Sequence, residues 1–369
     1  MMSAEEEKGR LALKDVPWDD FNVMSPEEKG RYLMHDGIPE HVLVAQQFSR
    51  SDLERVCTFA TRIRMISKQR AGRDFLTSLL SDKRAMLYFS QPSSRTFLSF
   101  CAACEILGLR LGEVRDTATS SEVKGESRED SVRTFSSYFD LIIMRTMQKG
   151  LAERTAWVLS QSDRPVPIVN AGSGADQHPT QAVLDIYTLS RSFERQGGID
   201  GKHIVFCGDL ARGRTVRSLA QLLLSYEAVH LSFVAPDKFQ IGDDIIAALE
   251  AAGVRYDLND DLEACLPNAD AVYMTRIQDE WDEVDGESSK VDFSRFSINV
   301  ETLSLLKGTA VIMHPLPRRD EIHPDVDRDP RAVYWRQVRN GMWVRTALIA
   351  QMFGCEDVIN AYFTKHAEA

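Results

Sequence analysis

The sequence lacks the features that mark several common classes of protein. Acidic residues outnumber basic ones by 55 to 44, and the net charge of −11 argues against a general nucleic-acid binder, which would carry a basic surface. This charge is compatible with a small anionic ligand, because local clusters of arginine and lysine capture such ligands. No uninterrupted apolar stretch approaches roughly 18 residues, so no membrane-spanning helix is expected.

Cysteine is scarce as well. The six cysteines among 369 residues lie mostly within apolar runs, so we expect no disulfide framework. Cys101 and Cys104 form a C-x-x-C pair, but no second pair or histidine pair stands at zinc-finger spacing, which favours buried helix cysteines over a metal site. The first residues, MMSAEEEKGR, are acidic and lack the apolar core of a signal peptide, so we expect a cytoplasmic protein.

Two nucleotide-binding signatures are missing too. The chain has no G-x-x-x-x-G-K-[ST] motif, so ATP hydrolysis of the P-loop type is not indicated. The segment GDLARG does not match G-x-G-x-x-G, which argues against a nucleotide-binding dehydrogenase. There is also no fixed-period repeat or low-complexity segment.

Short β-rich runs alternate with amphipathic stretches along most of the chain. Val216, Leu219, Ala220 and Leu223, for example, have helical spacing. This alternation, with near-continuous apolar strands, predicts an α/β fold with parallel sheets covered by helices on both faces. The expected strands are 85–89, 110–115, 141–145 and 166–170 in the first half, and 203–207, 229–234, 254–258, 271–275 and 310–314 in the second.

The chain divides into three parts. Residues 1–42 are polar with scattered apolar residues, and we expect an N-terminal extension that forms short helices or docks on the body. The hydrophilic stretch SRSFERQGGIDGK, at 190–202, is typical of a helix end and a linker. We therefore expect one doubly wound α/β domain over residues 43–190 and another over 191–340.

Polar residues gather just after the expected strands, where ligands bind in open parallel sheets. The strand at 85–89 is followed by SQPSSRT, in which Ser93 or Ser94 can cap the next helix. A helix N-terminus offers unpaired N–H groups and a positive dipole end, and Arg95 and Thr96 add donors. The segment is therefore either a plain cap or a phosphate cradle.

Two further strand ends in the first half carry similar groups. The run LIIM is followed by Arg145, and VPIVN is followed by AGSGADQHPTQ. His178 and Gln181 are spaced i, i+3, so a helix places them on one face. Such a pair is more often structural than catalytic, but the preceding AGSG turn also allows it to hold a carbonyl oxygen.

Three strand ends in the second half suit an anionic or amide ligand. GDLARGRTVRSL places Arg214 at a helix entrance, which suits a carboxylate. In MTRIQ, Arg276 and Gln278 share one side if the strand continues. In HPLPRRDE, two prolines flank Leu316 and remove two N–H donors, so local carbonyls are available to a ligand amine. A purely structural interpretation is also open for two of these segments: Arg276 and Gln278 as a polar pair at a strand end, and HPLPRRDE as a rigid turn without a ligand.

These segments, in this order, resemble the aspartate/ornithine carbamoyltransferase family over roughly residues 43 to 365. Ornithine enzymes of the family typically have H-C-L-P and S-M-G elements, whereas this chain has HPLP and no S-M-G, which favours the aspartate branch. The family usually has S-T-R-T-R where this chain has SSRTF, so Phe97 stands in place of an arginine. The segments that carry the resemblance are PSSRT, SSEVKGE, IIMRT, HPTQAVLDIYTL, GDLARGRTVRSL, YMTRIQ and HPLPRRDEI.

The resemblance implies transfer of the carbamoyl group of carbamoyl phosphate to L-aspartate, a step of de novo pyrimidine (UMP) biosynthesis, without a metal or organic cofactor. It implies a carbamoyl-phosphate domain over 43–190, an aspartate domain over 191–340, and a C-terminal helix within 341–369 that packs back on the first domain. It also implies a homotrimer with active sites shared between subunits. A regulatory chain or a dihydroorotase is a further candidate partner. We expect no binding to nucleic acid or to a membrane.

The resemblance also assigns roles to residues. Donors to the carbamoyl oxygen would stabilise the charge that grows there as the aspartate amine attacks. The residues expected to bind carbamoyl phosphate are Ser93, Ser94, Arg95, Thr96, Arg145, His178, Gln181, Pro315 and Leu316. The expected catalytic residues among them are Arg95, Thr96, Arg145 and His178. The residues expected to bind aspartate are Lys124, Arg214, Arg276 and Gln278, with Ser120 and Lys124 supplied by a neighbouring subunit.

Two alternatives stay open at this point. A carbamoyltransferase for another amine acceptor, such as an ornithine derivative, would keep the same phosphate cradle. A non-catalytic homologue that acts as a scaffold would show degenerate motifs, whereas each expected polar position is filled here.

Overall fold

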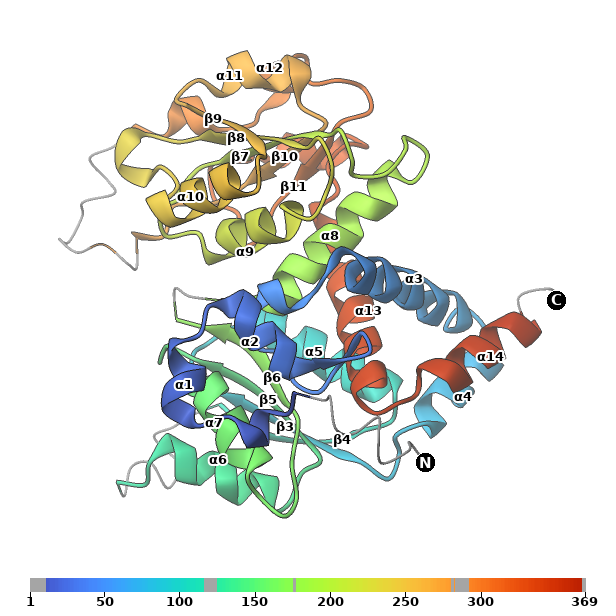
Figure 1. The fold of residues 1–369 in the computed structure, drawn as a ribbon. Helices are drawn as coiled ribbons and strands as arrows, with labels where there is room; N and C mark the ends of the chain where they lie inside the picture. The colour runs from blue at the N-terminus through green and yellow to red at the C-terminus, as the bar shows by residue number, and fades with distance from the viewer. Residues whose placement is uncertain (1–10, 116–124, 175–176, 280–281, 283–291, 367–369) are drawn as a thin grey trace. The chain divides into compact units, whose positions relative to one another are not determined.

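The computed structural model describes residues 11–115, 125–174, 177–279, 282 and 292–366 (Figure 1). The chain divides into two compact units, each with its own parallel sheet. Unit 1 comprises Met1–Thr180 and Gly341–Ala369, and unit 2 comprises Gln181–Asn340. No helix within the described ranges is long and apolar enough to cross a membrane.

Unit 1 contains a four-stranded parallel sheet in the order β4-β3-β5-β6. All residues of the central strand β5 are buried, as expected for an apolar strand covered on both faces. The order of strands reverses between β3 and β5, so their carboxyl ends form a switch point of the kind where ligands bind. The strands are β3 (Arg84–Phe89), β4 (Arg110–Val114), β5 (Leu141–Thr146) and β6 (Ile168–Ser173).

Helices cover this sheet. Two of them begin with side-chain caps: Ser49 and Asp52 form a capping box at the start of α3, and the Ser127 side chain accepts from the Asp130 N–H at the start of α6. One apolar core joins Met86 and Tyr88 of β3 to Leu151 and Ala156 of α7. The helices are α3 (Arg50–Ile66), α4 (Arg70–Ser78), α5 (Ser94–Ile106), α6 (Arg128–Ser136) and α7 (Leu151–Ser160).

The N-terminal extension docks on unit 1 through apolar contacts. Phe21 is fully buried in the same core as β3 and α7, and Trp18 packs on Trp157 with ring centroids 5.9 Å apart. The indole N–H of Trp157 donates to the carbonyl of Val16 at 2.8 Å. Its elements are η2 (Leu13–Asp15), α1 (Trp18–Val23), α2 (Pro26–Leu33), β1 (Met34–His35) and β2 (Ile38–Pro39), and η3 (Ala45–Gln47) follows it.

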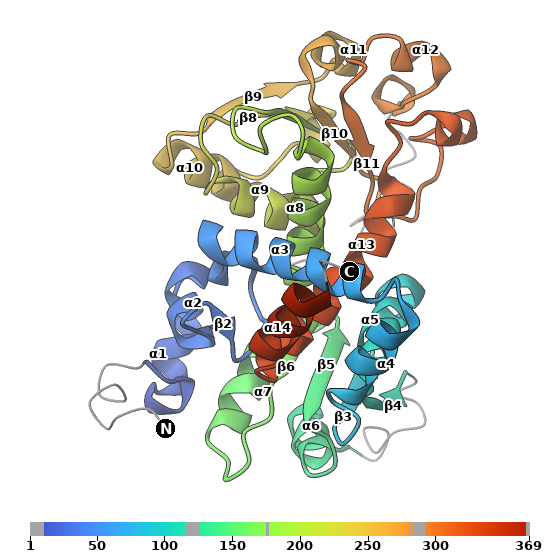
Figure 2. The same ribbon diagram turned by 90° about the vertical axis from the view of Figure 1, so that its right-hand side faces the viewer.

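The C-terminal segment packs back on unit 1, as predicted, but it contains two helices instead of one. They are α13 (Tyr334–Met352) and α14 (Glu356–His366), separated by a turn at Gly354, whose φ is +67°. Arg345 of α13 donates to Ser99 of α5 at 2.7 Å. Arg55 of α3 donates to Glu356 at 2.9 Å, and Figure 2 shows α14 beside α3.

Unit 2 contains a five-stranded parallel sheet in the order β11-β10-β7-β8-β9, which reverses between β7 and β10. Helices α9 and α10 lie on one side of it and α11 and α12 on the other (Figure 1). The strands are β7 (His203–Cys207), β8 (His230–Val234), β9 (Arg255–Asn259), β10 (Ala271–Met274) and β11 (Val311–Met313). The helices are α8 (Pro179–Phe193), α9 (Arg214–Leu223), α10 (Asp243–Ala251), α11 (Leu262–Cys265) and α12 (Val300–Leu303), with η6 (Asp237–Phe239), η7 (Leu266–Asn268), η10 (Ser294–Phe296) and η11 (Pro324–Arg328).

The predicted fold class, two doubly wound parallel α/β domains, is confirmed, and each expected strand is present with ends shifted by at most three residues. The six cysteines are all free. Cys101 and Cys104 lie on α5, and burial raises the pKa of both thiols, so they are poor nucleophiles and poor metal ligands.

One buried histidine makes stability depend on pH. His41 accepts the Ile168 N–H through Nδ1 at 3.0 Å, and burial lowers the pKa of His41 from 6.5 to about 4. Between pH 6.5 and pH 4, the unfolded chain therefore binds one more proton than the folded chain. The free energy of unfolding falls as pH drops through this range. The expected loss is about 3 kcal/mol.

The variant His41→Asn tests this dependence, because asparagine keeps an acceptor for the Ile168 N–H but does not titrate. Urea unfolding at several pH values should show a slope below pH 6.5 that is smaller in the variant by about one proton. An unchanged slope would show that His41 is not the titrating group.

Candidate active site

The segment SQPSSRT joins β3 to α5 at the switch point of unit 1. Ser93 occupies the N-cap position, yet no side chain among the described residues caps this helix. Ser94 and Arg95 are exposed, whereas Thr96 is buried. The plain capping interpretation is therefore not supported by the side chains, and the hydroxyls at this helix N-terminus are positioned for an anionic ligand.

Arg145, at the end of β5, forms hydrogen bonds with the loop between β3 and α5. Its carbonyl accepts from the Gln91 N–H and the Ser90 hydroxyl, each at 3.3 Å. Its side chain is only 7% exposed, and Nη1 donates to the carbonyl of Ala171 at 3.1 Å. A buried guanidinium on the strand whose end is bonded to the loop before α5 makes this region attractive to a phosphate.

Gly172 brings Arg145 and His178 together. Its φ is +115°, and a Cβ built there would lie 2.5 Å from Nη1 of Arg145 and 3.3 Å from Cδ2 of His178. The Gly172 N–H donates to the side chain of Asn170 at 2.9 Å, which holds the turn. Only glycine fits both the positive φ at this position and the small space beside Arg145 and His178. The AGSG turn therefore allows these two side chains to approach each other.

We therefore expect Gly172→Ala to lower kcat/KM for the reaction proposed below by about tenfold or more, because the methyl group must displace the Arg145 guanidinium. Steady-state kinetics and thermal unfolding measure this effect. Gly308→Ala is the control, since its Cβ would meet nothing within 4 Å. Full activity in Gly172→Ala would mean that the position of Arg145 does not matter.

Phe97 is a packing residue. It is buried and meets Phe89 edge-on, with ring centroids 5.3 Å apart. The guanidinium of Arg115, at the end of β4, lies over the Phe97 ring at 4.4 Å. A cation therefore stacks on the side chain that stands where the resemblance led us to expect an arginine.

In unit 2, Asp209 joins two of the predicted segments. It follows β7 and is completely buried. Its Oδ2 accepts from the Gln278 N–H at 3.0 Å and from Nε of Arg212 at 2.9 Å. Gly208 permits the close approach, because a Cβ there would lie 2.2 Å from the carbonyl oxygen of Thr275. GDLARGR and TRIQ are thus fixed side by side at the carboxyl ends of β7 and β10.

Arg214 and Arg276 stand on these two segments. Arg214 is the first residue of α9, and Arg276 donates through Nη1 to the carbonyl of Ile277 at 2.7 Å. Both side chains are half-buried. Two guanidinium groups on neighbouring strand ends suit a ligand with carboxylates.

The HPLP turn after β11 is organised by His314. The Leu316 N–H donates to Nδ1 of His314 at 2.7 Å, so the proton of the neutral ring lies on Nε2, which faces Glu321 at 2.7 Å. Burial lowers the pKa of His314, and the hydrogen bond to Glu321 opposes this effect in part. Leu316 has a φ of +58°, and its peptide bond to Pro317 is cis.

A buried carboxylate, Asp185 of α8, connects Gln181 to this turn. It accepts from Gln181 at 2.9 Å, from the Tyr273 hydroxyl at 2.8 Å and from Gln337 at 2.7 Å. Gln337 in turn accepts the His314 N–H at 2.9 Å. This network positions the predicted ligand groups Gln181, Pro315 and Leu316 within unit 2.

The structure thus assembles most predicted residues into two groups. Unit 1 brings together Arg145, His178 and the start of α5, and unit 2 brings together the ends of β7, β10 and β11. Ser120 and Lys124 lie outside the described residues. The sequence analysis did not identify Asp185, Asp209 and Gly172. Asp209 could have been found from its position directly after a strand. Asp185 could have been found from its i+4 spacing from Gln181.

Comparison with known proteins gives two matching family models. Residues 40–191 match the carbamoyl-P binding domain of aspartate/ornithine carbamoyltransferase, and residues 200–352 match the Asp/Orn binding domain. The aspartate carbamoyltransferase 3, chloroplastic, of Pisum sativum is 41% identical over 346 residues, which cover 92% of this chain and 85% of the relative.

Solved structures agree with these matches. The catalytic subunit of M. Jannaschii aspartate transcarbamoylase is 35% identical with a TM-score of 0.75, over 85% of this chain and 98% of that chain. The Trypanosoma cruzi aspartate transcarbamoylase in complex with N-(phosphonacetyl)-L-aspartic acid is 35% identical with a TM-score of 0.75. The match covers 84% of this chain and 94% of that chain.

Proposed function

Because this chain belongs to the aspartate/ornithine carbamoyltransferase family, we propose that it transfers the carbamoyl group of carbamoyl phosphate to the amine of L-aspartate. The products are N-carbamoyl-L-aspartate and phosphate, and the reaction is a step of de novo pyrimidine biosynthesis. The observation that carries the proposal is the convergence of Arg145 and His178 on Gly172, beside the N-terminus of α5.

Carbamoyl phosphate binds through its anionic group to the start of α5. Ser93, Ser94, Arg95 and Thr96 hold the phosphate oxygens with Arg145, and the helix dipole adds to their attraction. Thr96, Arg145 and His178 also donate to the carbamoyl oxygen. Gln181 and the carbonyls of Pro315 and Leu316 orient the carbamoyl NH₂. Residues 43–190 with 341–369 form the carbamoyl-phosphate domain of this proposal, and 191–340 form the aspartate domain.

Aspartate binds through its two carboxylates to Arg214, Arg276, Gln278 and Lys124. Its amine attacks the carbamoyl carbon, the C–O bond to phosphate breaks, and the leaving phosphate accepts the amine proton. Negative charge grows on the carbamoyl oxygen during attack, so Arg145 and His178 stabilise the transition state more than the substrate. The side chains act by position and charge, and no covalent intermediate is needed.

An acceptor panel tests this function. The purified chain, given radiolabelled carbamoyl phosphate, should carbamoylate L-aspartate at least about a hundredfold faster than ornithine, because Arg214 and Arg276 suit carboxylates. A preference for ornithine or an ornithine derivative would support the alternative acceptor. Carbamoylation of no amine would support a scaffold role.

We also propose a homotrimer in which Ser120 and Lys124 enter a neighbouring subunit's site. Arg95→Ala chains and Lys124→Ala chains should each be nearly inactive, whereas a mixture should recover activity, because some sites then lack both substitutions. Subunit exchange is verified by mass. No recovery despite exchange would place Lys124 in its own subunit's site.

We propose a cytoplasmic location for this chain. The relative from Pisum sativum is described as chloroplastic, so fractionation of the source cells decides between the two compartments. Co-purification from the same cells tests whether a regulatory chain or a dihydroorotase accompanies the trimer.

A further inference from the structure

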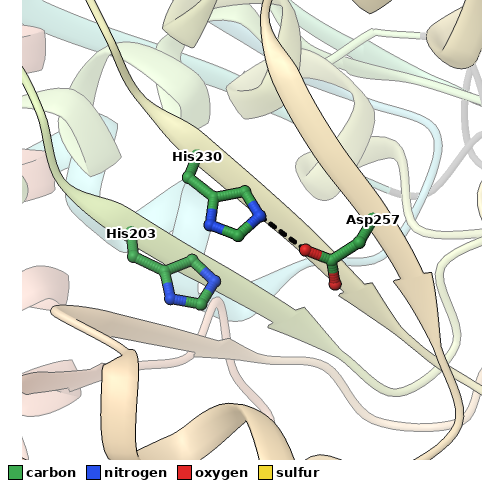
Figure 3. A group of neighbouring side chains, drawn as sticks. All are labelled: His203, His230 and Asp257. Carbon is green, nitrogen blue, oxygen red and sulfur yellow. Dashed lines mark hydrogen bonds and ion pairs between the residues drawn. The ribbon is translucent and has the colours of Figure 1, made fainter.

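Three polar side chains gather on one face of the sheet in unit 2, at the amino ends of its strands. His203 and His230 are the first residues of β7 and β8 and are paired in register. Asp257 of β9 pairs with Ser232, two residues beyond His230. Side chains two residues apart on a strand share a face, so the Ser232 side chain lies on the same face as these three, and Figure 3 shows His203, His230 and Asp257 side by side on that face.

The donor atoms of these groups are close together. Nε2 of His230 lies 2.5 Å from Oδ1 of Asp257, and Nε2 of His203 lies 2.6 Å from the Ser232 hydroxyl. That hydroxyl is 3.0 Å from the same Asp257 oxygen. One ligand atom from each of His203, His230 and Asp257 falls within 4.8 Å of the others. Since the carboxyl-end loops do not use this cluster, the proposed catalysis does not explain it.

We propose that His203, His230 and Asp257 form a binding site for a zinc ion, with a water molecule or the Ser232 hydroxyl as the fourth ligand. Two imidazoles and one carboxylate are a donor set that zinc prefers, and four-coordinate geometry suits three protein ligands with one further position. Calcium and magnesium prefer oxygen ligands, so the two histidines select against them.

The surroundings of His203 favour a ligand role. The backbone of Asn268 forms a hydrogen bond with His203. Metal-binding histidines almost always donate their second N–H to such a partner, which fixes the tautomer.

The cluster is also accessible from solvent. The side chains of His230 and Asp257 are 19% and 40% exposed, and β9 is the edge strand. Arg255, in register with His230, is exposed, so water screens its charge. The backbone N–H of His203 donates to the carboxylate of Asp270 at 2.9 Å, and Lys307 pairs with the other oxygen of that carboxylate at 2.9 Å.

Binding requires a change in the rings. The imidazoles are stacked, with centroids 4.1 Å apart and planes 11° from parallel, so one ion cannot lie in both ring planes. The χ2 torsion of histidine is broad, and the proposed site requires rotation about it so that both Nε2 atoms face a common point. The zinc ion then cross-links β7, β8 and β9, three strands that otherwise depend on backbone pairing and packing.

Titration of the full chain with zinc tests this site. After treatment with a chelator, the chain should bind one zinc ion per subunit, and zinc but not magnesium should raise the melting temperature. His230→Asn and Asp257→Asn should each weaken that binding by at least about a hundredfold, since loss of a direct ligand exceeds loss of a supporting hydrogen bond. His323→Asn is the matched control, because His323 and Asp325 form an exposed pair at 3.4 Å.

Cobalt substitution gives a second measurement that does not require a variant. The wild-type chain with Co²⁺ should show visible bands of a tetrahedral nitrogen and oxygen site, without thiolate charge transfer. Thiolate bands, binding that survives in both cluster variants, or no binding by the wild-type chain would each overturn the proposal.

Discussion

Replacing Arg145 with alanine is expected to lower kcat/KM for carbamoyl phosphate by about three orders of magnitude. The side chain is 7% exposed and stands at the end of β5, beside the loop that enters α5. Loss of one donor to a developing oxyanion costs about 10²- to 10³-fold, and in the proposed site Arg145 also pairs with the phosphate. Initial rates at saturating aspartate measure the effect.

Two controls separate chemistry from folding. Arg145→Lys keeps the charge but not the planar pair of donors, so it should recover little activity. Arg110→Ala removes an exposed arginine at the amino end of β4 and should leave the rate unchanged. If Arg145→Ala unfolds at the same temperature as the wild type yet keeps more than about a tenth of its activity, Arg145 does not contact the reacting group.

Arg276→Ala is expected to raise KM for aspartate by about two orders of magnitude while leaving carbamoyl phosphate binding intact. Arg276 is half-buried on the segment that Asp209 holds against β7, and its guanidinium is suited to a planar carboxylate. A truncated partner of a desolvated charge pair typically costs about 2–5 kcal/mol. Steady-state kinetics with aspartate varied measure this change.

The matched control is Arg295→Ala, an exposed arginine on η10 of the same unit. It should leave both kinetic constants unchanged. A normal aspartate KM in Arg276→Ala would remove this residue from the aspartate site and leave Arg214 as the candidate.

The strands and their carboxyl ends were predictable because buried parallel strands are continuous apolar runs bounded by polar loops. The prediction for β6 placed its end three residues early, since Ala171, Gly172 and Ser173 carry no apolar signal although the structure buries them. Gly172 illustrates why: its importance lies in the φ of +115° and the nearness of Arg145, which no spacing rule reveals.

The groups that support the site were harder to predict than those expected to touch substrate. Asp185 accepts three hydrogen bonds in the interior, but two of the donors, Tyr273 and Gln337, come from distant parts of the chain. The same holds for His203, His230 and Asp257, which become neighbours only through the register of β7, β8 and β9. Long-range pairing of this kind leaves no local pattern in the sequence.

Direct binding of carbamoyl phosphate tests the central claim, that the α5 region binds this substrate and the ends of β7 and β10 bind aspartate. Calorimetric titration without aspartate should show wild-type affinity in Arg276→Ala and a loss of about a hundredfold or more in Arg145→Ala. Equal loss in both variants, or normal binding by Arg145→Ala, would contradict the assignment.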